Sequence, residues 1–108
     1  MNLQVKWTLA ALQSLSDVLD YTFEQFGERQ LRKLTKRINS SVLRISFFPK
    51  TGKPEPYVSE LVGADFRSVV VIKKIKLYYT VNKEIMFVEY IKNTNMDDST
   101  MLKKLQLS

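Results

Sequence analysis

The stretch from Asp65 to Ile91 reads DFRSVVVIKKIKLYYTVNKEIMFVEYI and indicates a β-sheet. Most of its residues are β-branched or aromatic, which are the types that strands favour. Two polar pairs, Lys73-Lys74 and Asn82-Lys83, divide the stretch into three segments and are the expected turns. We therefore predict an antiparallel meander of three strands. Its register must be inferred from the apolar pattern, because neither turn is the Asn-Gly pair that specifies a tight hairpin.

A two-residue loop at Lys73-Lys74 assigns each side chain of the meander to one face, because side chains alternate along a strand. In this register the facing pairs are Ile72 with Ile75, Val71 with Lys76, and Val69 with Tyr78. One predicted face is nearly all apolar and should lie on the core: Phe66, Ser68, Val70, Ile72, Ile75, Leu77, Tyr79 and Val81. The other face mixes cations with apolar residues: Arg67, Val69, Val71, Lys76, Tyr78 and Thr80.

The mixed face and its turn suggest a surface for a partner segment or an anionic ligand. The residues of this predicted binding surface are Arg67, Val69, Val71, Lys73, Lys74, Lys76 and Tyr78. The alternative interpretation is a solvated sheet face with no partner.

Composition excludes several kinds of chemistry. The 108 residues predict a single domain over residues 1–108, with 44% hydrophobic and 26% charged residues, as in an ordinary globular protein. The chain has no cysteine and no histidine, so zinc sites of the structural type and nucleophilic machinery that uses histidine are excluded. We expect no metal and no cofactor. The N-terminus has neither the basic nor the apolar region of a signal peptide, and we expect a cytoplasmic protein with no membrane partner.

The positive charge is concentrated in the middle of the chain. Residues 29–76 hold 12 Lys or Arg against 3 Asp or Glu, a net +9, whereas the remaining residues sum to −3 and the whole chain to +6. A basic block of this density attracts polyanions, either nucleic acid or an acidic protein segment. Part of the block also fits the solvated side of a helix.

The segment before the meander predicts a short strand and a helical hairpin. Leu3 to Trp7 alternates between apolar and polar residues, and Thr8 suits a helix N-cap. Apolar residues then recur at spacings of three and four over residues 9–26, and Gly27 fits the end of this helix. A second apolar stripe predicts an antiparallel helix that ends before Pro49: Leu31, Leu34, Ile38, Val42 and Ile45.

The remaining segments are shorter. Tyr57 to Val62 is predicted to be a short strand, and a brief helix is expected after Asp97 and Asp98. Trp7 and the Phe47-Phe48 pair are expected in the core. The complete order gives an α+β fold, with a short N-terminal strand, an antiparallel helical hairpin and an antiparallel β-meander. The helices should pack on one face of the sheet and leave the other face open.

An ordered set of segments resembles the RelE/ParE superfamily of type II toxin-antitoxin toxins. The set comprises VKWT at residues 5–8, LSDVLDYTFEQFGE at 15–28, FFP at 47–49, DFRSVVV at 65–71 and IKLYYTV at 75–81. The resemblance covers roughly residues 3–92 and implies a small bacterial toxin, neutralised by a cognate antitoxin that wraps over the hairpin and sheet. RelE-like members cleave messenger RNA on the ribosome, whereas ParE-like members inhibit DNA gyrase.

The resemblance also implies where a ribonuclease site would lie. Arg67 and Lys76 match two basic positions of the RelE-like site, and Tyr78 is the candidate for its phenol. A third basic position falls on Val69, an expected arginine falls near Thr94, and no tyrosine follows Tyr90. Each lost charge-stabilising donor costs about a hundredfold in rate. The catalytic set Arg67, Lys76 and Tyr78 therefore applies only to a RelE-like mechanism.

These observations favour a ParE-like toxin of the plasmid stabilisation type. We expect it to act by binding its target, with DNA gyrase the first candidate, and to form a hetero-oligomer with its antitoxin. One alternative is a metal-independent endoribonuclease that acts on ribosome-bound messenger RNA through a rearranged Lys/Arg/Tyr site. Another is a degenerate, non-toxic member that binds nucleic acid or protein.

Overall fold

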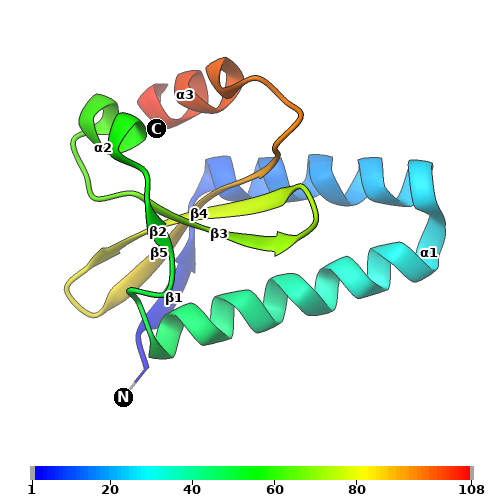
Figure 1. Cartoon of the computed structure of the whole chain (residues 1–108), viewed down its shortest axis with the longest axis horizontal. Coiled ribbons are helices and arrows are strands. Elements are labelled where there is room, and N and C mark those ends of the chain that lie inside the picture. The colour runs from blue at the N-terminus through cyan, green and yellow to red at the C-terminus, as the bar shows by residue number, and fades with distance from the viewer. Residues whose placement is uncertain (1, 108) are drawn as a thin grey trace.

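The computed structural model describes residues 2–107 and contains one five-stranded sheet with helices on both faces (Figure 1). In chain order the elements are β1 (Gln4–Trp7), α1 (Leu9–Phe47), β2 (Lys53–Pro54), α2 (Pro56–Val62), β3 (Arg67–Ile72), β4 (Ile75–Asn82), β5 (Ile85–Asn93) and α3 (Asp98–Leu107). The strand order is β1-β5-β4-β3-β2, with β1 parallel to β5 and the other pairs antiparallel. The predicted α+β class and the order of strand, helical hairpin and meander are confirmed.

Helix α1 is a hairpin of two limbs, residues 9–26 and residues 28–47, which meet at Gly27. The backbone of Gly27 has φ 85° and ψ −176°, a conformation that is almost confined to glycine. Thr8 caps the start of the first limb, where its side-chain oxygen accepts a hydrogen bond of 3.0 Å from the amide of Ala11. The predicted cap and the predicted bend are both confirmed.

The register of the β3–β4 hairpin differs from the prediction by one residue. Ile72 faces Ile75 as predicted, but Val69 faces Leu77 instead of Tyr78, and Val71 has no partner in the ladder. Val71 is therefore the extra residue of a β-bulge. The predicted pairing of Val71 with Lys76 is wrong for the same reason.

This slip exchanges the two faces along β3 up to the bulge, because a shift of one residue turns side chains to the opposite side, whereas Ile72 beyond the bulge keeps its predicted face. Val71 is 5% exposed and lies in the core under α1, whereas Val70, which was assigned to the core, is 62% exposed. The assignment along β4 is correct for Ile75, Leu77 and Tyr79, all of which are in the core under α1. The second turn is also displaced by one residue, to Lys83-Glu84.

Both faces of the sheet are covered. The core under α1 includes Leu34, Ile38, Ile45, Leu77, Tyr79, Met86, Val88 and Ile91. On the other face, α2 and α3 bury a second cluster: Ala10, Val58, Phe66, Tyr78, Tyr90, Met101 and Leu105. The prediction of a fully open face is therefore wrong, although the short helix after Asp97 and Asp98 was expected and is confirmed as α3.

The segment predicted as a strand at Tyr57 to Val62 is helix α2. Pro56 stands at the first turn of α2, where its missing N–H costs nothing. Gly63 ends the helix in the left-handed conformation, with φ 77°, and its amide donates to the carbonyl of Ser59. These two residues outweigh the strand preference of Tyr57 and Val58.

The Phe47-Phe48 pair was expected in the core and is exposed, at 50% and 66%. Leu34, Ile38 and Ile45 form the buried side of the second limb, and the helical period puts Phe47 on the opposite side. Trp7 is half-buried and packs against the core under α1, as expected. None of the helices in residues 2–107 combines the length and the apolar character needed to cross a lipid bilayer.

Candidate functional site

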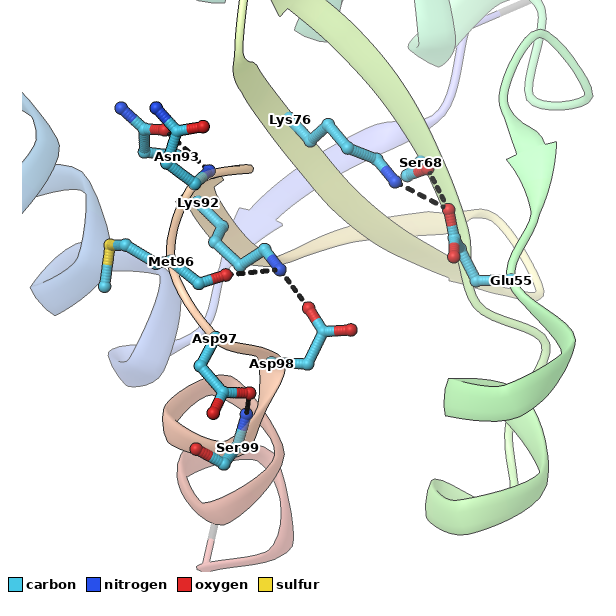
Figure 2. Close-up of polar contacts among 10 residues, drawn as sticks. Glu55, Ser68, Lys76, Lys92, Asn93, Met96, Asp97, Asp98 and Ser99 are labelled. Atoms are coloured by element: carbon cyan, nitrogen blue, oxygen red, sulfur yellow. Dashed lines mark hydrogen bonds and ion pairs between the residues drawn. The ribbon is translucent and has the colours of Figure 1, made fainter.

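Lys76 of β4 is held by a carboxylate that belongs to another element. Its Nζ lies 3.0 Å from Oε2 of Glu55, the residue that precedes α2, and the Ser68 hydroxyl donates to the same oxygen over 2.6 Å (Figure 2). The ammonium also lies 5.2 Å from the centre of the Tyr78 ring. Lys76 and Glu55 are 19% and 18% exposed, so this is a partly buried ion pair.

The ion pair shifts the pKa of both groups toward their charged forms. Burial raises the pKa of Glu55, but the hydrogen bond from Ser68 and the contact with Lys76 outweigh it, so that the pKa lies below its usual value. Burial lowers the pKa of Lys76, but the hydrogen bond to Glu55 and the charge interactions with Tyr78 and Glu55 outweigh it and raise the pKa. Lys76 is therefore held in its charged form, and the carboxylate of Glu55 balances its charge.

Lys92 is a buried cation that the sequence did not single out. It lies beside Lys76 in the β4–β5 ladder and is only 5% exposed. Its Nζ forms an ion pair with Asp98 at the start of α3 and donates to the carbonyl of Met96 over 3.4 Å (Figure 2). The sequence could have indicated Lys92 only through its position opposite Lys76, and that position becomes visible only when the β4–β5 register is known.

Tyr78 cannot present its side chain to a substrate in this structure. It is 3% exposed and lies among Phe66, Tyr90, Met101 and Leu105, beneath α2 and α3. Its role here is to fill the second core cluster.

Arg67 lies on the other face of the sheet from Lys76. It faces Tyr79 in the ladder, and its Nη1 donates to the carbonyl of Gly52 over 2.9 Å. The Tyr79 hydroxyl donates to the carbonyl of Pro49 over 2.7 Å and accepts from the amide of Gly52 over 2.9 Å. Burial raises the pKa of Tyr79. Arg67 and Tyr79 thus fasten the loop between α1 and β2.

The predicted binding residues do not form one surface. Arg67, Val69 and Val71 are on the α1 side of the sheet, and Lys76 and Tyr78 are on the α2/α3 side. Lys73 and Lys74 are exposed at the turn, where Lys73 has φ 47°. The structure brings Lys76 and Tyr78 together and separates both from Arg67.

The hairpin carries an exposed apolar surface that belongs to the apolar pattern of residues 9–26. Leu12, Phe23 and Phe26 are 50%, 54% and 64% exposed, and Leu15 and Leu19 beside them are half-buried. The spacing of the five places them along one side of the first limb, and we call them the apolar stripe. The apolar side of this limb is wider than the sheet can cover. That width, which can be read from the sequence, is what could have predicted an exposed apolar surface here.

A shallow depression lies near the turn that joins β4 to β5. It has a volume of about 460 Å³ and is lined by Ala64, Asp65, Thr80, Val81, Asn82, Phe87 and Glu89. Burial raises the pKa of Glu89, although the Thr80 hydroxyl donates to this carboxylate over 2.7 Å. Across residues 2–107 no three His, Cys, Asp or Glu side chains gather in a way that would hold a metal ion.

Comparison with known proteins gives two findings. The family model described as the ParE toxin of type II toxin-antitoxin system, parDE, matches residues 5–97. A chain of the solved structure described as the chromosomal ParDE TA system from P. aeruginosa has a similar fold, with a TM-score of 0.66 and 20% sequence identity. That match covers 84% of this chain and 95% of the other, and at this identity it shows the fold alone. A search of the curated proteins found no match.

Proposed function

Because the chain belongs to the ParE toxin family of type II toxin-antitoxin systems, we propose that it is a toxin that acts by binding its target. DNA gyrase is the target we propose, and a cognate antitoxin is the proposed inhibitor. The separation of Arg67 from the pair Lys76 and Tyr78 carries this conclusion, because a ribonuclease would need these groups around one phosphate.

The surroundings of each group support binding over cleavage. Lys76 is neutralised by Glu55, and the Tyr78 ring is 3% exposed. A cation that stabilises developing charge must face the reacting phosphate. Arg67 instead donates to the carbonyl of Gly52 and lies 3.6 Å from the Asp65 carboxylate, so part of its hydrogen-bonding capacity and charge is already used within the protein. Cleavage through this set would require α2 and α3 to leave the sheet and Arg67 to change sides.

The apolar stripe is the surface we propose for the antitoxin. Leu12, Phe23 and Phe26 follow one side of the first limb, as expected for a site that accepts an amphipathic helix. Such a helix would bury side chains that are now at least half exposed. The toxin and antitoxin would then form a hetero-oligomer.

Expression in a bacterial host tests the proposed mode of action. Induction should arrest growth, with filamentation and a DNA-damage response, and co-expression of the antitoxin from an adjoining gene should restore growth. Rapid arrest of translation with cut messengers would instead indicate the ribonuclease alternative. Normal growth after induction of a folded protein would support the non-toxic alternative and contradict the proposal.

A matched pair of variants tests the antitoxin surface. Phe23→Ser removes an apolar side chain from the stripe, and Tyr57→Ser removes an exposed ring, 65% accessible, from α2. We expect the Phe23→Ser toxin to remain toxic and to escape the antitoxin, whereas the Tyr57→Ser toxin should remain under its control. Equal neutralisation of both variants would place the antitoxin elsewhere.

A further inference from the structure

The outer side of the second limb of α1 carries a row of cations, which we call the basic ridge. It consists of Arg29, Arg32, Lys33, Lys36, Arg37 and Arg44, all of them exposed. The buried side chains of the same limb, Leu34, Ile38 and Ile45, lie on the opposite side of the helix. The ridge therefore lies on the side of the helix that faces away from the sheet. Figure 1 shows the limb that carries it as the part of α1 that runs from the bend toward β2.

The charge of the ridge is barely compensated within the protein. The second limb has six cations and one acidic residue, Glu28, which gives it a net +5. Glu28 lies 3.2 Å from Arg32, but both side chains are more than two-thirds exposed, so the pair is weak. Among residues 2–107 no other ridge cation has an ion-pair partner. The ridge is thus available to an external anion.

The first limb has the opposite charge. Residues 9–26 contain Asp17, Asp20 and Glu24 and no cation, a net −3. An anionic polymer is therefore attracted to one limb of the hairpin and repelled by the other. This asymmetry fixes the side on which such a polymer lies.

We propose that the basic ridge binds the phosphate backbone of double-stranded DNA without regard to sequence. The 16 residues from Arg29 to Arg44 span about 22 Å of helix, which matches about six phosphates of one strand at 3.4 Å each. Four of the six cations are arginines, whose planar guanidinium binds phosphate oxygens in a bidentate manner. Single-stranded binding needs aromatic rings for base stacking along the strand, but residues 29–44 contain none, and the exposed Phe47 and Phe48 follow the last ridge cation.

This inference goes beyond target inhibition, because it concerns the affinity of the isolated chain for DNA. The test is fluorescence anisotropy of a labelled 20-base-pair duplex of mixed sequence, titrated with the full chain between 50 and 200 mM salt. Six phosphate contacts predict that the affinity falls about 2,000-fold over this range, since the slope is about −0.9 per contact. The variant Lys33→Gln/Arg37→Gln has two contacts fewer, so the fall in its affinity over the same salt range should be about 12-fold smaller.

The control variant is Lys103→Gln/Lys104→Gln, which removes two exposed cations from α3 and changes the net charge equally. It should bind the duplex with the salt dependence of the wild type. Circular dichroism checks that both variants are folded.

Three results would overturn the proposal. The first is no duplex binding at 50 mM salt, and the second is an equal loss in the ridge and control variants. The third is equally effective competition by polyglutamate or by a single strand, which would indicate an acidic protein partner or a single-strand site. Because no gyrase is present in this assay, duplex binding without toxicity would contradict only the proposed function.

Discussion

Replacing Lys76 with methionine tests whether this cation has a structural role. The change keeps an unbranched side chain that is one atom shorter and leaves Glu55 with the hydrogen bond from Ser68 but without its ion pair. At 3.0 Å the gross attraction is about 5–6 kcal/mol for an effective dielectric constant of 20. Desolvation offsets most of this attraction, so we expect a coupling free energy of about 1–2 kcal/mol and a cost of about 2 kcal/mol for Lys76→Met alone.

Urea unfolding, followed by far-UV circular dichroism, measures this coupling in a double-mutant cycle of wild type, Lys76→Met, Glu55→Gln and the double variant. The double variant should be more stable than the sum of the two single effects predicts, because it leaves no unpaired charge. The folded fraction of Lys76→Met should retain toxicity. Additive effects within about 0.5 kcal/mol would refute the structural role, and a hundredfold loss of activity in the folded variant would indicate that Lys76 takes part in chemistry.

Two further predictions concern the loop before β2 and the β4–β5 hairpin. In Gly52→Ala the new methyl group would lie 2.5–2.9 Å from three atoms of the Tyr79 side chain. Unfolding in urea should therefore show that the free energy of unfolding falls by about 1–3 kcal/mol. In a Tyr79→Leu background most of this loss should disappear, because the clashing ring is absent. Glu89 has a raised pKa, so its contribution to stability is greatest below the ordinary pKa of glutamate and is lost as pH rises through the raised value. Glu89→Gln should therefore be more stable than wild type at pH 7, an advantage that disappears on acidification; an advantage independent of pH would contradict this assignment.

The larger elements follow from local patterns. Gly27 and the periodic apolar residues on both sides of it predict the hairpin, and the alternating stretch from Asp65 to Ile91 predicts the meander. These signals are local, since the helix period and the strand alternation are read within one segment. The β-bulge at Val71 leaves no such signal in a run of three valines, and its consequence is that the β3 side chains before Ile72 lie on the face opposite to the predicted one.

The candidate site depends on that register and on contacts between distant segments. Nothing near Lys76 in sequence indicates that Glu55 reaches it, or that α3 covers Tyr78. The exposure of Phe23 and Phe26 depends on how much of the first limb the sheet covers, which is also a tertiary property. The sequence therefore predicts which kinds of residues the site contains. The face of the sheet on which each residue lies, and the residues that it contacts, can be determined only from the three-dimensional structure.

The most direct test of the central claim uses purified protein with two targets in parallel. DNA gyrase supercoiling and cleavage of messenger RNA on programmed ribosomes are measured with wild type and Lys76→Met. We predict that both proteins inhibit supercoiling and that the messenger stays intact. Messenger cleavage that Lys76→Met abolishes, together with undisturbed supercoiling, would contradict it.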